Sequence, residues 1–300
     1  MPRLLDILTS PWAILPEKLL EIQEIYRVHL RGEKIDLGII EKKTGKPLNS
    51  EPKGYEVIND VAVIPVEGII AKKMNLFMQI SGGTSSELLT RDFLQALNDK
   101  TARAIILAID SPGGTVDGTQ EVANVIYGSR GIKPVAVFSN GMMASAAYWI
   151  GSAADARYIS GDTVQVGSIG VVAAHTDISK AEEQMGIKTT EIVAGKFKRI
   201  ASQYGPLTPE GRANIQDAVD HVYSVFVADV ARNLKTDVET VLENMADGRL
   251  FYGRQSIKAG MVNGVSTLDR VINMYGNPDS PRTVRAAVED RIRETCFTQN

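Results

Sequence analysis

Three runs of mainly apolar residues, separated by polar turns, mark the first half of the chain. They lie at 61–70, 104–109 and 134–138 and are rich in valine and isoleucine, as is typical of strands buried on both faces of a sheet. The intervening segments carry apolar residues three or four positions apart, as at Leu89 and Phe93, which is typical of amphipathic helices. This alternation predicts an α/β fold with a largely parallel sheet and crossover helices.

Two helix starts carry capping signals. Thr84 followed by Glu87 has the spacing of a capping box and predicts that a helix begins there. Further along the chain, the Thr-Pro-Glu sequence at 208–210 predicts the start of a long helix that reaches about Leu234.

Changes in composition divide the chain into three parts. Residues 1–54 are charged and predict an N-terminal helical extension, with Pro16 at the first helical position, followed by a linker. The main domain is expected over 55–275. A proline-containing exit then predicts a flexible tail over 276–300, with a short charged helix at 283–295.

The overall composition fits a globular protein without a disulfide framework. The chain has 300 residues, a formal net charge of −3 and one cysteine, Cys296. The mild negative charge argues against nucleic acid as the main partner. The apolar stretch at 4–8 is too short and too acidic for a signal peptide, and no run approaches membrane-spanning length, so we expect a cytoplasmic protein without a membrane anchor.

The segment 141–149 is the strongest candidate for a reactive site. It follows the apolar run 134–138 and reads as a buried strand that turns sharply into a helix, with Ser145 near the first helical turn. Unpaired amide groups at a helix start favour negative charge, so an oxyanion formed beside Ser145 would find donors. This pattern predicts a nucleophilic serine.

A second turn supplies a possible partner for that serine. The run 104–109 ends in Asp-Ser-Pro-Gly-Gly-Thr at 110–115, where two glycines let the backbone approach a substrate closely. Taken alone, a strand followed by Gly-Gly is a common structural turn. Together with Ser145, it indicates half of an oxyanion hole.

The base that would activate the serine is ambiguous from the pattern alone. Of the three histidines, only His175 follows an apolar run in a suitable way, because His29 and His221 lie in a charged segment and on an amphipathic helix. Lys196 and Lys198 end another apolar run and would share one face of an extended strand. A lysine base at neutral pH needs a pKa about three units below its usual value, at a desolvation cost of about 4 kcal/mol.

Four ordered motifs resemble the signal peptide peptidase A family of Ser-Lys peptidases. They are Ser-Pro-Gly-Gly at 111–114, Gly-x-x-Ala-Ser-Ala-Ala-Tyr at 141–148, Gly-Ser-Ile-Gly-Val at 167–171 and Gly-x-x-Lys at 195–198. The resemblance runs from about residue 61 to residue 271. Within the family, the chain is most similar to the phage and prophage members, the protein C-like head-maturation proteases. This similarity rests on the opening Met-Pro-Arg-Leu-Leu, the Ser-Pro-Trp element and the expected lack of an anchor.

This resemblance implies a role for each matching residue. Ser145 would be the nucleophile and Lys198 the general base, with the hydroxyl of Ser168 orienting the lysine. The backbone N–H groups of Gly114 and Ala146 would stabilise the oxyanion. The implied reaction is peptide-bond hydrolysis through an acyl-enzyme, for which no metal or organic cofactor is required.

The resemblance also implies a fold, partners and a location. The fold would be a crotonase-like or Clp-like spiral of ββα units, in a homo-oligomer with active sites at subunit interfaces. Substrates would be scaffold or capsid proteins, cleaved in the host cytoplasm or inside a phage procapsid. Three alternatives stay open, namely a host-type signal peptide peptidase-like enzyme, a non-hydrolytic crotonase-like acyl-CoA enzyme and an inactive capsid-assembly component.

Overall fold

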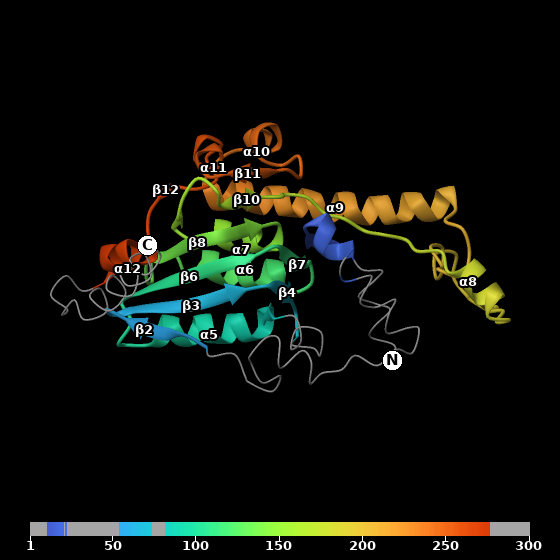
Figure 1. The fold of residues 1–300 in the computed structure, drawn as a ribbon, viewed down its shortest axis with the longest axis horizontal. Helices are drawn as coiled ribbons and strands as arrows, with labels where there is room; N and C mark the ends of the chain where they lie inside the picture. Colours follow the sequence, from blue (N-terminus) through green and yellow to red (C-terminus); the bar gives the residue numbers. More distant parts are fainter. Residues whose placement is uncertain (1–10, 21, 23–53, 74–81, 277–300) are drawn as a thin grey trace, which may run out of the picture.

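A computed structural model describes residues 11–20, 22, 54–73 and 82–276 (Figure 1). Most of the predicted N-terminal extension and nearly all of the predicted tail lie outside the described residues, as do the tail helix at 283–295, His29 and Cys296. Within the described part, residues 16–20 are helical, which confirms the helix predicted to begin at Pro16.

The larger of two sheets crosses the centre of the molecule (Figure 1). Its strands are β2 (Glu56–Ile58), β3 (Val61–Glu67), β6 (Ala104–Ser111), β8 (Val135–Ala144), β9 (Ala156–Ile159), β10 (Gln165–Gly167), β11 (Leu250–Tyr252) and β12 (Gly264–Val265). The order is β11-β10-β8-β6-β3-β2, with β9 also pairing with β8 and β12 pairing with β9. The central pairs β3–β6 and β6–β8 are parallel, which confirms the predicted topology.

A smaller sheet lies at the carboxyl ends of β3 and β6. It consists of β1 (Trp12–Ile14), β4 (Ile69–Ala71), β5 (Gly83–Ser85) and β7 (Gly113–Thr115), in the order β1-β7-β4-β5. The chain passes from β3 into β4 through Gly68, which has a φ of 65°. The apolar run at 61–70 is therefore two strands in two sheets rather than one strand.

Helices complete a repeating unit that includes one strand from each sheet. The helices are α5 (Ser86–Asn98), α6 (Thr119–Gly128), α7 (Ala146–Ser152), α8 (Ser179–Gln184), α9 (Pro209–Leu234), α10 (Val238–Asn244), α11 (Arg254–Lys258) and α12 (Leu268–Tyr275). The order β6-β7-α6 is one such ββα unit, and β3, β4 and α5 form another with β5 inserted. The described chain thus confirms the predicted α/β fold of ββα units. None of its helices is both long enough and apolar enough to cross a membrane.

Both faces of the larger sheet are covered, and this explains the continuous apolar runs. Ile105 and Leu107 of β6 pack into the main core with α5, α6 and α7, whereas Ile106 faces the opposite side and packs with Val271 of α12. Successive side chains of a strand point to opposite faces, so a strand buried on both faces needs apolar residues throughout.

The predicted capping box at Thr84 is wrong by one residue. The N-cap of α5 is Ser85, whose hydroxyl accepts a hydrogen bond from the N–H of Leu88. The Thr84 hydroxyl instead exchanges hydrogen bonds of 2.9 Å with the backbone N–H and C=O of Glu67. Thr84 is therefore used to join β5 to the end of β3, and the adjacent serine caps the helix.

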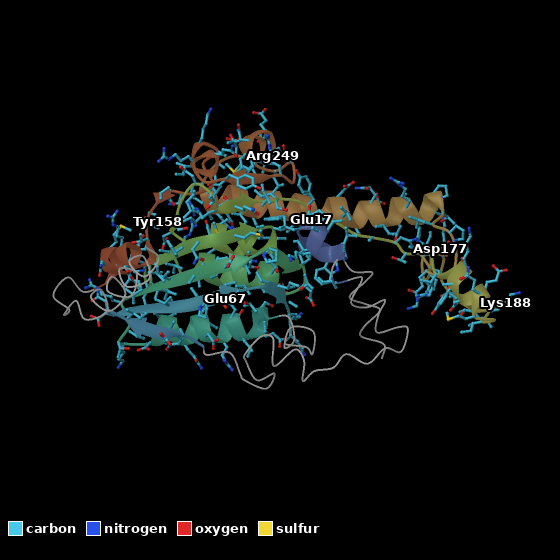
Figure 2. The ribbon with its side chains drawn as sticks, viewed as in Figure 1. Glu17, Glu67, Tyr158, Asp177, Lys188 and Arg249 are labelled. Atoms are coloured by element: carbon cyan, nitrogen blue, oxygen red, sulfur yellow. The ribbon has the colours of Figure 1, made fainter. Side chains whose placement is uncertain are left out.

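Helix α9 extends well beyond the sheets, and residues 176–208 form an arm at its N-terminal end (Figure 1). None of the residues in this arm is buried. The arm is tied to itself and to α9 by the hydrogen bond from Ile178 N to Gln203 O and by the ion pair between Lys196 and Glu210. Figure 2 shows Asp177 and Lys188 on this arm, away from the sheets.

Candidate active site

Ser145 occupies the turn between β8 and α7, as the sequence predicts. Its backbone has φ 53° and ψ −117°. Residues other than glycine rarely adopt this conformation, which costs roughly 1–3 kcal/mol. The turn is held on both sides, since Ser145 N donates to Gly167 O at 2.7 Å and Trp149 N donates to Ser145 O at 2.9 Å. A strained strand-to-helix turn of this kind is how a nucleophile is presented at the edge of a parallel sheet.

The Ser145 hydroxyl has no hydrogen-bond partner among the described residues, although it is fully buried. A buried hydroxyl without a partner costs about 1–3 kcal/mol in desolvation. Backbone strain and an unpartnered hydroxyl therefore coincide at one residue. Both features are typical of functional sites.

Helix α7 is anchored to α9 through its aromatic residues. The ring of Trp149 stacks on Phe226 with a centroid distance of 4.4 Å, and its Nε1–H donates to Asp229 at 2.9 Å. Asp229 also accepts a hydrogen bond from Gln120 of α6 at 3.1 Å. Three helices are thereby fixed together directly behind Ser145.

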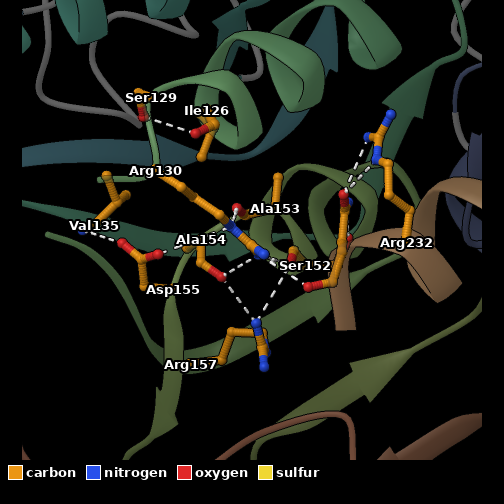
Figure 3. A network of polar contacts seen from close by, with 11 residues as sticks. Ile126, Ser129, Arg130, Val135, Ser152, Ala153, Ala154, Asp155, Arg157 and Arg232 are labelled. Atoms are coloured by element: carbon orange, nitrogen blue, oxygen red, sulfur yellow. Dashed lines mark hydrogen bonds and ion pairs between the residues drawn. The ribbon is translucent and has the colours of Figure 1, made fainter. Parts of the chain in front are cut away.

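Two arginines bind the carbonyl groups at the C-terminal end of α7 (Figure 3). Arg130 donates to the carbonyl oxygens of Ala153 and Ala154 at 2.9 and 2.8 Å. Arg157 donates to Ala154 O at 3.0 Å and to Met261 O at 3.0 Å. Burial lowers the pKa of both guanidinium groups from its ordinary value. The two cations satisfy carbonyls that a helix end leaves unpaired and fix the helix that carries Ser145.

Replacing Arg157 with methionine is expected to lower the free energy of unfolding by about 3 kcal/mol, because several buried carbonyls lose their donor. Urea unfolding followed by circular dichroism measures the change. Arg254 is the matched control, since its side chain is 81% exposed and makes one ion pair with Asp162. Arg254→Met should cost less than about 0.5 kcal/mol. Equal losses in the two variants would contradict the anchoring role of Arg157.

The two glycines of the Ser-Pro-Gly-Gly motif are required by close packing. A Cβ on Gly114 would lie 1.7 Å from the carbonyl oxygen of Ile70, the residue it pairs with in β4. Gly113 has a φ of 103°, and a Cβ there would lie 2.9 Å from the Cβ of Ser145. The motif therefore places β7 directly beside the serine.

Strand β1 lies on the other edge of β7. It pairs antiparallel with β7 in a register that sets Ala13 opposite Gly114, and its other edge pairs with Val172. Trp12 exchanges backbone hydrogen bonds with Val172 at 2.8 and 2.9 Å, and Leu15 N donates to Pro112 O at 3.2 Å. Backbone groups of successive residues in a strand face opposite edges, so the N–H and C=O of Ala13 face Gly114. This strand was not predicted from the sequence.

Ser168 lies close to Ser145 through the backbone. Gly167, the residue before it, accepts the hydrogen bond from Ser145 N. Ser168 is 5% exposed, has a φ of 51°, and donates its N–H to Arg249 O at 2.8 Å. The structure therefore brings Gly113, Gly114, Ala146 and Ser168 to the surroundings of Ser145.

Lys198 does not lie among these residues around Ser145. It lies exposed in a turn on the arm, where its N–H donates to Gly195 O at 3.1 Å. The strand predicted for this segment is absent from the described chain, so Lys196 and Lys198 do not share the face of a strand. The other candidate base, His175, has its Nε2 within 2.9 Å of Ser202 O, at the base of the arm. No group of three His, Cys, Asp or Glu side chains that could hold a metal ion occurs among the described residues.

A buried serine at a strained strand-to-helix turn, beside a Gly-Gly strand, is the arrangement of a serine hydrolase. Residues 129–277, which include Ser145, Ser168 and Lys198, match the profile of peptidase family S49. The chain belongs to this family of serine-type peptidases.

Two curated relatives come from phages. The chain is 30% identical to "Capsid assembly protease C" of Escherichia phage lambda over 83% of its length and 56% of the relative. It is 32% identical to "Head-tail preconnector protein GP5" of Enterobacteria phage P21 over 82% of its length and 46% of the relative. The chain thus spans about half the length of these relatives. Among solved structures, a ClpP1 mutant from Listeria monocytogenes aligns with a TM-score of 0.44 and 14% identity, covering 69% of this chain and 92% of that one.

Proposed function

We propose that the protein is a serine endopeptidase that uses a Ser-Lys dyad. The neutral amine of Lys198 takes the proton from Ser145 as Oγ attacks the carbonyl carbon of a peptide. The N–H groups of Gly114 and Ala146 stabilise the tetrahedral oxyanion, and the ammonium of Lys198 then gives its proton to the leaving amine. Water hydrolyses the resulting ester by the same steps in reverse, while the Ser168 hydroxyl orients the lysine.

The observation that carries this proposal is the state of Ser145. Its backbone is strained, and its buried hydroxyl is unpartnered and lies next to Gly113 and Gly114. A structural serine in such a position would be expected to satisfy its hydroxyl or to be replaced by glycine or alanine. The arrangement instead supports a nucleophile whose base is not among the described residues around it.

The base is proposed to come from a neighbouring copy of the chain. The Lys198 side chain makes no hydrogen bond or ion pair with the described residues around Ser145, and the arm that carries it has no buried residue. The arm also exposes a set of large apolar side chains, and contiguous exposed apolar surface is typical of protein interfaces. These are Met185 (66% exposed), Ile187 (51%), Ile192 (95%), Val193 (53%) and Phe197 (55%). A second copy that covers this arm would receive Lys198 in its own active site.

The proposed substrates are proteins of a phage head. The names of the two phage relatives refer to capsid assembly and to a head-tail preconnector protein. By similarity, this chain would cleave scaffold or capsid proteins in the host cytoplasm or inside a procapsid. These names belong to the whole relatives, of which the chain matches 56% and 46%.

Mass spectrometry of protein termini tests the function. The wild type and Ser145→Ala are each co-expressed with phage capsid and scaffold proteins, and casein serves as a general substrate in vitro. We expect new termini and casein hydrolysis with the wild type only. A folded, oligomeric wild type that cleaves neither set would favour the inactive assembly component. Turnover of an acyl-CoA without proteolysis would favour the crotonase-like enzyme.

A further inference from the structure

The segment Trp12–Ile14 lies in the candidate active site as an extended strand between two other chain segments. On one edge it pairs with β7, and on the other edge Trp12 exchanges two backbone hydrogen bonds with Val172. A peptide that adds itself as a strand between existing segments in this way is a common mode of peptide binding. Here the bound peptide belongs to the chain itself.

The carbonyl group of Ala13 lies beside the nucleophile. A single reference point, the position a Cβ would take on Gly113, is 2.4 Å from the Ala13 oxygen and 2.9 Å from the Ser145 Cβ. The Ala13 oxygen and the Ser145 Cβ are therefore separated by no more than the sum of these two distances. The same carbonyl faces Gly114, whose N–H is the proposed oxyanion donor. Ala13 thus occupies the place of the residue whose carbonyl is attacked.

The side chains of the segment are held as those of a bound peptide would be. Ala13 is fully buried and Trp12 and Ile14 are each 3% exposed, packed with Ile69 and Val172 among others. Beyond Ile14, the Leu15 N–H donates to Pro112 O and the chain enters the helix at 16–20. The chain is therefore held in place on both sides of the bond between Ala13 and Ile14.

We infer that this segment is the enzyme's own substrate and that Ser145 cleaves the bond between Ala13 and Ile14. This inference rests on the proposed function. Ser145 Oγ forms an ester bond with the Ala13 carbonyl carbon as the bond from that carbon to the Ile14 nitrogen breaks. The base returns the serine proton to the Ile14 amine, and water then hydrolyses the ester, which leaves a carboxylate on Ala13. Cleavage frees the residues before Ile14 and clears the strand position beside Val172 for other substrates.

Intact-mass analysis and N-terminal sequencing of four purified full-length proteins test the inference. They are the wild type, Ser145→Ala, Ala13→Lys and Leu20→Lys, and casein hydrolysis is measured for each. Ala13→Lys places a long charged side chain in a fully buried position, and Leu20→Lys is the matched control because Leu20 is 64% exposed. We expect the wild type and Leu20→Lys to lose residues 1–13 and to begin at Ile14. The Ser145→Ala and Ala13→Lys proteins should keep the bond intact.

The casein assay separates this inference from the proposed function. A wild type that hydrolyses casein but keeps the bond between Ala13 and Ile14 would overturn self-cleavage and leave the peptidase standing. Cleavage at this bond in Ser145→Ala would also overturn it, because another protease would be responsible. A wild type that does neither contradicts the proposed function, and self-cleavage with it. If Ala13→Lys does not fold, the wild type and Ser145→Ala still decide the question.

Discussion

Replacing Ser145 with alanine is expected to lower the rate of peptide-bond hydrolysis by at least about three orders of magnitude. The substitution removes the attacking oxygen and therefore the acyl-enzyme. It should not lower stability and is expected to raise the free energy of unfolding by about 1–3 kcal/mol, because it removes a buried hydroxyl that has no hydrogen-bond partner among the described residues, while alanine keeps the same Cβ at the strained φ. Initial rates on casein and thermal unfolding of the same preparation measure both quantities.

Ser139→Ala is the matched control for this experiment. Ser139 lies on β8, the same strand that leads to Ser145, and it too is fully buried with an unpartnered hydroxyl. Its loss should leave most of the activity. A Ser145→Ala protein that keeps a substantial fraction of wild-type activity would remove the nucleophile from the mechanism.

Lys198→Ala is expected to be as inactive as Ser145→Ala, because without a base the serine keeps its proton. Lys196→Ala should retain most of the activity, since the Lys196 ammonium pairs with Glu210 at 2.8 Å and is 69% exposed. His175→Ala should also retain most of it, because the His175 ring contacts Ser202 O. Initial rates of the three variants on casein test these expectations. An active Lys198→Ala protein together with an inactive His175→Ala protein would reverse the assignment of the base.

The parts of the fold that could be predicted are those set by local sequence. Apolar runs buried on both faces gave β6 and β8, and small residues after β8 indicated the turn at Ser145. The Thr-Pro-Glu sequence predicted the start of α9 at Pro209 and its end at Leu234. These features depend on neighbouring residues, and their chemistry can be read along the chain.

The parts that could not be predicted depend on residues that are distant in the sequence. β1 has three residues, and its strand state comes from pairing with β7 and Val172, more than 95 positions away. Thr84 looked like a helix cap, but the fold places the backbone of Glu67 within reach of its hydroxyl. The position of Lys198 on an exposed arm follows from no local pattern. Long-range pairing overrides local signals at β1 and at Thr84.

Mixing the Ser145→Ala and Lys198→Ala proteins under subunit exchange tests the central claim, a Ser-Lys site shared between subunits, most directly. Each protein alone should be inactive. If one copy supplies Ser145 and its neighbour supplies Lys198, random exchange at equal amounts leaves both residues intact at roughly a quarter of the sites, and casein hydrolysis should recover to about that fraction of the wild-type rate. Oligomers shown to contain both proteins but inactive at every mixing ratio would contradict the shared site.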